Sequence, residues 1–405
     1  MHRRSFLAAA LSPAFLAWSE PLKHKVKITD MKVMLVRGAF DWPMVKIETD
    51  AGVTGIGESY WGHGVKDIML GYLRPLILGE DPLDVERLYT KMVTRTGGAG
   101  SIAGATVTAI SGVEIALWDV VGKLLGVPVV KLLGGQYRDS VRAYWTTPVP
   151  RPLDPASCRE FAQMLKEHRY GFKAVKVGYL RQMDRREPFS RHFTNQDLQN
   201  NTAAFTNVRE AVGTDVDIVV HCHWEFDLAD ALALARAVAP ARPWWLEDPM
   251  PPDFSTSWVK LTEESPIPIL TGENLYTRHG FAPFIINHGV HMVQIDIPKA
   301  GGLLEARKIA DLADIFYLPV CAHNVASPLG TIASAHCAAA IRDFAGHEMN
   351  CGRLNSWDLW EKYAIYDRPF VKDGRIQLSD APGYGVALNE DYVRAHLADG
   401  EAWWG

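Results

Sequence analysis

The feature that most constrains the fold is a repeat that begins after Val141. Helical patterns such as residues 227–239 and 301–314 alternate with short, continuously apolar segments that have the length of strands. Buried strands separated by helices are typical of a parallel sheet covered by helices, and about eight such units predict a barrel. The strands that we expect cover residues 172–178, 217–223, 243–249, 267–273, 292–298, 315–324 and 347–350.

Polar side chains mark the ends of these apolar strands. Because all strands of a parallel barrel open their carboxyl ends onto one face, such residues are predicted to meet in one site. Any single one of them could equally be a solvated or helix-capping group, but the recurrence on strand after strand favours a site. The residues with this placement are Lys176, His221, His223, Glu247, Glu273, Asp296 and His323.

A different pattern precedes the repeat. From Lys25 to Gly57 apolar and polar residues alternate around a glycine-containing turn, which predicts a β-meander. Helical spacings follow over residues 84–91 and 103–125. Strands followed by helices predict a separate α+β unit that ends near Gly135.

Composition narrows the class of partner. The 405 residues are 48% hydrophobic and 22% charged, with a formal net charge of -5. These values are ordinary for a globular protein and argue against nucleic acid or an anionic membrane as the main partner. We therefore expect a small molecule to be the ligand.

The first residues have the character of a targeting segment. Arg3 and Arg4 precede an apolar run from Phe6 to Trp18 and a small-residue pattern. This order is typical of an export signal and resembles a twin-arginine signal, so we expect residues 1–24 to direct the protein to the periplasm. A short membrane anchor or an unstructured start are the alternatives. Beyond this segment we expect no stable membrane span.

Equal spacing connects three of the strand-end residues. Glu247 follows His221 by 26 positions, and Glu273 follows Glu247 by 26 positions. One helix–strand unit thus separates each residue from the next, and three such ligands would converge above a barrel on a divalent cation with places left for a substrate. On one strand, His221 and His223 should point the same way, with Cys222 pointing the other.

Together these motifs resemble the enolase superfamily, in its mandelate racemase subgroup. The resemblance rests on IALWDVVGKLLGVPVVKLLGG (115–135), WLEDP (245–249), LTGEN (270–274), QIDIPKAGG (294–302) and CAHN (321–324), in family order. It implies an α/β fold, with a modified (β/α)7β TIM-like barrel at 141–369 under an N-terminal α+β cap at 25–140, to which residues 370–405 return. Family members are commonly oligomeric, so a homo-oligomer is expected.

The family also implies roles for individual residues. Glu247 and Glu273 match metal positions for Mg2+, and Asp296 orients His323, which takes a proton from the carbon next to a substrate carboxylate. On the same basis Lys176 neutralises that carboxylate. Further substrate contacts are expected from Glu348 at the next strand end and from the cap-loop residues Trp61 and His63, although an ordinary mobile loop is an equal alternative for the latter two.

One departure from the family pattern and one match to a part of the subgroup decide the expected reaction. Many members carry Lys-x-Lys where this chain has Lys176-Val177-Gly178, so the second lysine base is missing and simple racemisation is disfavoured. His223 has the position of the acid in sugar-acid dehydratases of the subgroup. The resemblance therefore implies dehydration of an aldonate to a 2-keto-3-deoxy acid through an enediolate. The alternative for His223 is a structural role, in which its ring only forms hydrogen bonds with neighbouring backbone.

His221 stands where the family has a carboxylate. Imidazole suits Zn, Mn or Fe better than Mg2+, so Mn2+ or another divalent metal is an alternative cofactor. Mg2+ with a shifted carboxylate such as Glu225, or loss of the metal, are the other two interpretations. Epimerisation with His223 as second base, and a catalytically silent protein that binds a sugar acid, remain the competing functions.

Overall fold

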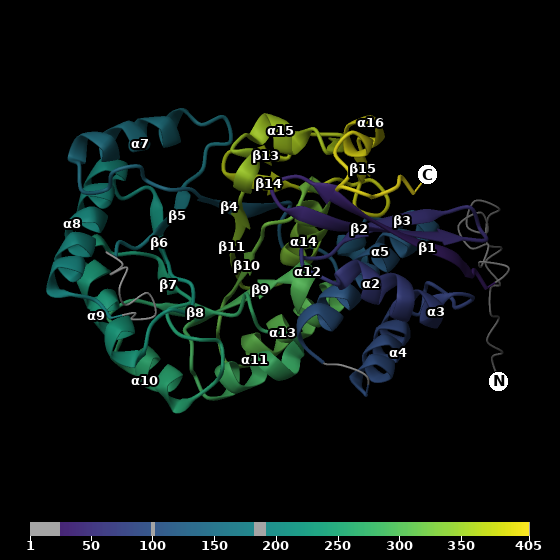
Figure 1. Ribbon diagram of the computed structural model, residues 1–405, viewed down its shortest axis with the longest axis horizontal. Helices are drawn as coiled ribbons and strands as arrows, with labels where there is room; N and C mark the ends of the chain where they lie inside the picture. The colour runs from purple at the N-terminus through teal and green to yellow at the C-terminus, as the bar shows by residue number, and fades with distance from the viewer. Residues whose placement is uncertain (1–24, 99–101, 182–191, 405) are drawn as a thin grey trace, which may run out of the picture.

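The computed structural model describes residues 25–98, 102–181 and 192–404 (Figure 1). The predicted export signal at 1–24 lies outside the described residues, as do parts of the cap loop near residue 100 and of the segment after Gly178. Two regions lie side by side in Figure 1, a sheet-and-helix cap and a ring of helices around parallel strands.

The cap is built on the predicted meander. Strands β1 (Ile28–Arg37), β2 (Asp41–Thr49) and β3 (Thr54–Glu58) pair antiparallel in that order. Helix α5 (Gly104–Leu125) packs closely on β3 because Gly57 has no side chain: a Cβ there would lie 2.5 Å from the Ala116 nitrogen. The remaining helices of the cap are α2 (Val65–Ile68), η1 (Met69–Leu73), α3 (Arg74–Ile77), α4 (Val85–Gly97) and α6 (Val129–Leu132).

The second region is an eight-stranded parallel barrel, and it confirms the predicted fold class. The strands are β4 (Ser140–Thr146), β5 (Ala174–Gly178), β6 (Asp217–His221), β7 (Trp245–Glu247), β8 (Ile269–Thr271), β9 (Met292–Asp296), β10 (Val320–His323) and β11 (Phe344–Met349). Each strand pairs with the next, and β11 pairs with β4 to close the barrel. The helices that connect them are α7 (Pro155–Glu167), α8 (Asn195–Val212), α9 (Leu228–Val238), α10 (Thr256–Glu264), α11 (Thr277–Ile286), α13 (Leu303–Ile315) and α14 (Pro328–Ala340), with the short α12 (Ile297–Ala300) before α13.

Strand β4 was missing from the strands expected within the repeat. Its apolar run is interrupted by Arg142, which has the inward direction of Tyr144 two positions later; at the amino end of the barrel it pairs with Asp217 and stacks on Trp244 at 4.3 Å. A strand with a polar residue at its centre lacks the continuous apolar run by which the others were recognised.

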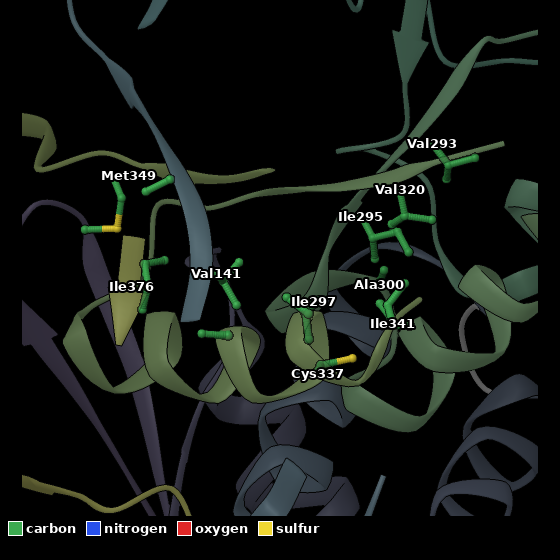
Figure 2. Close-up of a cluster of buried hydrophobic side chains, with 14 of the residues drawn as sticks. Val141, Val293, Ile295, Ile297, Ala300, Val320, Cys337, Ile341, Met349 and Ile376 are labelled. Carbon is green, nitrogen blue, oxygen red and sulfur yellow. The ribbon is translucent and has the colours of Figure 1, made fainter. Parts of the chain in front are cut away.

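Side chains along each barrel strand point alternately into the barrel and toward the helices, which gives two separate hydrophobic clusters. Seven side chains, one from each of β4 to β10, fill the barrel interior: Tyr144, Ala174, Val219, Trp245, Leu270, Met292 and Cys321. Their neighbours on the strands face the helices, and Figure 2 shows part of that outer layer, with Val293, Ile295 and Val320 above Cys337 of α14. The interior is thus packed with side chains, and it supports the site at one end of the barrel.

The last residues return to the cap. Glu401 accepts hydrogen bonds from Lys66 Nζ at 2.6 Å and from the Leu35 nitrogen at 3.1 Å. Leu397 forms an isolated bridge with Val36, and Figure 1 shows the C-terminus beside the cap strands. The predicted domain boundaries stay a prediction, but these contacts agree with a C-terminal segment that belongs to the cap.

One helix of the described chain is long and apolar enough to cross a membrane, although no such run was expected after the N-terminal segment. It is α5, and 78% of its apolar window is buried inside the protein. Three of its polar side chains contact other segments of the fold: Ser111, Glu114 and Asp119. Helix α5 is therefore packed as a core helix between cap and barrel.

Candidate active site

Strand alternation explains why the predicted residues meet at one end of the barrel. Lys176 follows Ala174 by two positions, His221 follows Val219, and Glu247 follows Trp245, so each points inward like the core residue before it. The same relation holds for Asp296 and His323 with respect to β9 and β10. The apolar interior thus ends in a layer of polar groups at the carboxyl ends of the strands.

Asp296 and His323 form the predicted pair. His323 Nδ1 lies 2.6 Å from Asp296 Oδ2, and both side chains are buried. Because a carboxylate only accepts, Nδ1 carries the proton and Nε2 is left to face the site. Nε2 lies 3.4 Å from Glu273 Oε2 and 3.8 Å from Glu348 Oε2.

Three buried carboxylates form a cluster next to this pair. One oxygen from each of Glu247, Asp248 and Glu273 lies within 4.8 Å of the other two. Glu273 Oε2 and Asp248 Oδ2 are buried without a hydrogen-bond partner in the described structure. Hard oxygen ligands that converge, two of them without a hydrogen-bond partner, are what Mg2+ and similar divalent cations bind, so the residues present fit such a cation.

Asp248 is the member of the cluster that sequence reasoning missed. It directly follows Glu247, so regular alternation would turn it away from the site. Its φ of 49° ends β7 in the left-handed region and breaks that alternation. Burial, together with repulsion from Glu273 and Glu247, holds the pKa of Asp248 well above its usual range. The motif WLEDP contained this residue, but nothing in the letters indicated the turn.

Lys176 is tied into the site by two carboxylates. Its Nζ lies 2.7 Å from Glu247 Oε1 and 2.8 Å from Glu348 Oε1, and all three side chains are buried. Burial alone would lower the pKa of Lys176, but the neighbouring carboxylates raise it well above its usual value. Glu348 also accepts a hydrogen bond from Thr146 Oγ1, a second contact that the sequence did not reveal. Lys176 is thus a fixed positive charge at the centre of the site.

His221 and His223 point at each other, as strand alternation predicted, although His223 lies beyond the end of β6. Their Nε2 atoms are 2.8 Å apart, and His221 Nδ1 lies 3.3 Å from Glu247 Oε1. If both rings are neutral, His221 donates from Nδ1 to the carboxylate and accepts from the His223 Nε2–H. Both nitrogens of His221 therefore have partners beside the carboxylate cluster, and its role as a metal ligand stays a prediction.

The charges of the site shift the pKa values of the two candidate acid–base histidines in opposite directions. Burial alone would lower the pKa of His323, but three surrounding carboxylates raise it to about 9. Burial, together with His221 and Lys176, lowers the pKa of His223 to about 4. At neutral pH these groups alone leave His323 protonated and His223 neutral. Positive charge added at Glu273 would weaken the attraction that keeps the proton on His323.

The cap covers the site with aromatic side chains. The ring of Tyr60, just after β3, lies 6.2 Å from that of His323, and Trp61 stacks on Tyr60 at 5.6 Å. Lys299 Nζ lies 4.2 Å from the centre of the Tyr60 ring and donates to Asn274 Oδ1. Trp61 therefore lies near the site, whereas His63 is exposed and forms no hydrogen bond or ion pair with the described residues of the site.

Fold and site together define a class: a closed barrel whose mouth combines an oriented histidine, a cluster of carboxylates and a buried lysine under a separate cap. Comparison with known proteins places the chain within that class. Residues 30–134 match the mandelate racemase / muconate lactonizing enzyme N-terminal domain, and residues 158–392 match the enolase C-terminal domain-like family. The chain belongs to the enolase superfamily, as its motifs predicted.

Individual relatives agree with this placement. A D-xylonate dehydratase of Haloferax volcanii is 39% identical over 376 residues, which cover 93% of this chain and 90% of that protein. An arabinonate dehydratase of Saccharolobus solfataricus is 30% identical, over 88% and 92% of the two chains. A mandelate racemase/muconate lactonizing enzyme-like crystal structure from Rubrobacter xylanophilus has a TM-score of 0.85 and 34% identity, and covers 94% of this chain and 100% of its own.

Proposed function

We propose that the protein is a hydro-lyase that dehydrates an aldonate to a 2-keto-3-deoxy acid. The single observation that carries the proposal is the buried His323–Asp296 pair, in which the second ring nitrogen of His323, Nε2, faces the carboxylate cluster. Curated relatives named as D-xylonate, D-galactonate and arabinonate dehydratases support the reaction and the substrate class.

A divalent cation held by Glu247, Asp248 and Glu273 would supply positive charge to the substrate carboxylate. Mg2+ is our first choice because the cluster offers oxygen only, and Mn2+ is the alternative if His221 also binds. Binding of this cation is testable without turnover, by calorimetric titration of the purified protein with each metal.

The residues of the chain would then move two protons. His323 Nε2 takes the proton from the α carbon while Asp296 holds the ring in place, and Lys176 stabilises negative charge that develops on the substrate oxygens. A protonated His223 gives its proton to the β hydroxyl, which leaves as water when the C–O bond breaks, and the ring returns to the neutral form that its pKa of about 4 favours. The resulting enol tautomerises to the 2-keto-3-deoxy acid.

Proton NMR in D2O with a panel of aldonates tests the reaction. Loss of the α-proton signal together with a new 3-deoxy methylene establishes dehydration. His323→Asn should abolish both changes, and His223→Asn should abolish elimination while leaving exchange of the α proton measurable. No change with any acid, in the presence of Mg2+ or Mn2+, would favour a catalytically silent protein that binds sugar acids.

One observation favours a second candidate, epimerisation. The low pKa of His223, about 4, keeps this imidazole neutral, and a neutral imidazole accepts protons more readily than it donates them. His223 would then be the second base, in place of the lysine that Gly178 replaces. Exchange at the α carbon without a 3-deoxy product in the same NMR experiment would identify this reaction.

We also infer that the protein is exported and forms a homo-oligomer. Export rests on Arg3, Arg4 and the apolar run that follows, and the test is fractionation of cells that produce the full chain or an Arg3→Lys, Arg4→Lys variant. Sedimentation of the purified chain tests the oligomer.

A further inference from the structure

A cavity of about 270 Å³ opens beside Lys176 and His221, and His323 is not among the residues that line it. Its walls come from the end of β4, the end of β5 and the segment after β11. Since a water occupies about 30 Å³ in the liquid, this volume corresponds to roughly nine waters, which is enough for an extended chain of several hydroxylated carbons. Neither of the proton transfers proposed above uses this space.

Gly178 keeps the cavity open. It follows Lys176 by two positions on β5, so a side chain at 178 would point to the same side of the strand as Lys176. A Cβ placed there meets no atom within 4 Å, and the backbone of Gly178 is not in the left-handed region. The glycine is therefore required neither by packing nor by backbone conformation, and its consequence is empty space next to the reacting groups.

The walls of the cavity are polar but carry little charge. The hydroxyl of Thr147 and the amide of Asn355 bond to none of the described residues, and Asn350 uses only its Oδ1, which accepts from the Gly352 nitrogen at 2.7 Å. The one lysine in the lining is already paired with two carboxylates. Uncharged donors and acceptors fit neutral hydroxyl groups and offer nothing to a second carboxylate or a phosphate. Trp145 and Pro148 add apolar surface for the C–H groups between the hydroxyls.

We propose that this cavity binds the polyhydroxylated tail of the substrate while its carboxylate lies at the Glu247–Asp248–Glu273 cluster. The inference rests on the proposed function and adds a specificity: acids of five or six carbons are preferred to short hydroxy acids. Gly178 thus has two effects, since it removes the second base and creates room for the tail.

The test compares binding of D-glycerate, D-xylonate and D-gluconate by calorimetry, with Mg2+ present. The titrations use the His323→Asn background, in which the ligand is not consumed. Gly178→Leu fills the cavity without a backbone clash, and Asn355→Gly removes one amide while keeping a residue that accepts the left-handed φ of 46°. Gly71→Leu is the matched control, because Gly71 is exposed in the cap and its Cβ also meets nothing within 4 Å.

Two hydrogen bonds from the tail correspond to about thirtyfold in affinity, so the five- and six-carbon acids should bind at least tenfold more tightly than D-glycerate. Gly178→Leu should reduce this preference to less than about threefold, Asn355→Gly should reduce it in part, and Gly71→Leu should leave it intact. Equal affinity for all three acids, or a preference that survives Gly178→Leu, would overturn the proposal.

The test of the tail site and the test of dehydration can fail independently of each other. A chain-length preference that Gly178→Leu removes supports the tail site even if the wild-type protein shows no dehydration. Dehydration of D-xylonate with equal affinities for all chain lengths leaves the proposed function standing and refutes the tail site.

Discussion

Contacts between the cap and the barrel lead us to predict that the protein loses stability as the pH rises from 5.5 to 8. Glu114 of α5 is fully buried, and its carboxyl accepts from the Leu303 nitrogen at 2.8 Å, the Leu304 nitrogen at 3.0 Å and Trp118 Nε1 at 2.6 Å. The first two donors are the first residues of α13, so a cap side chain satisfies the N-terminus of a barrel helix. Gly302 makes this approach possible, since a Cβ there would lie 2.1 Å from Glu114 Oε2.

Glu114→Ala removes the acceptor of three donors, the buried Leu303 nitrogen and the partly buried Leu304 nitrogen and Trp118 Nε1. At about 1 kcal/mol for each lost hydrogen bond, the variant should be about 3 kcal/mol less stable at pH 5.5. Burial raises the pKa of Glu114 from 4.5 to about 7, so its contribution to stability is complete below pH 4.5 and is lost as the pH rises through 7. Integration from pH 5.5 to pH 8 gives a loss of about 2 kcal/mol in the wild type alone, and the difference between wild type and variant should shrink to about 1 kcal/mol.

Urea unfolding followed by circular dichroism at both pH values measures these differences. Glu86→Ala is the control, because Glu86 also joins the cap to α13, through Lys308, but its side chain is 64% exposed. It should cost at most about 1 kcal/mol at either pH. A larger cost of Glu114→Ala at pH 8 than at pH 5.5 would show that the three donors hold the carboxylate ionised, and would refute the reasoning that burial dominates.

Three further predictions concern the site and the core. Asp248→Asn should weaken Mg2+ binding at least tenfold in calorimetric titration, whereas the exposed Asp253→Asn should not change it. Asp296→Asn should lower kcat on the order of a thousandfold or more with little change in KM, because the amide can donate to His323 Nδ1 and favour the wrong tautomer; an unchanged kcat would exclude the pair as the base. Burial lowers the pKa of His336 from 6.5 to about 4, so its contribution to stability is complete above pH 6.5 and is lost as the pH falls through 4. Urea midpoints should show a loss of up to about 3 kcal/mol over that range in the wild type, and His336→Asn, which can still accept from the Val130 nitrogen, should lose less.

The sequence predicted the parts of the site that follow from regular strands. Glu247 and His323 stand out because a charged or titratable residue closes an apolar strand, and strand geometry alone brings such residues to one face. The family motifs added the capping role of the α+β unit and the pairing of Asp296 with His323.

The parts that were missed depend on contacts that the order of residues does not record. Asp248 enters the cluster through a left-handed backbone turn, and Thr146 reaches Glu348 across the closure between β4 and β11. Tyr60 comes from the cap, more than 260 residues before the histidine that it covers. No period or spacing in the sequence encodes these three relations, because each arises where separate segments pack together.

The balance of buried charge connects these findings. Five buried carboxylates surround the site, namely Glu247, Asp248, Glu273, Asp296 and Glu348, and the buried lysines near them are Lys176 and Lys299. Uncompensated charge is costly in a buried setting, so the excess of negative charge must be met by protons or by a cation. Protons would occupy the very imidazole that is needed as a base, whereas a divalent cation at the carboxylate cluster balances the charge and also attracts the substrate carboxylate. This requirement of charge balance, more than the identity of any one ligand, is the reason to expect that the proposed reaction depends on a metal.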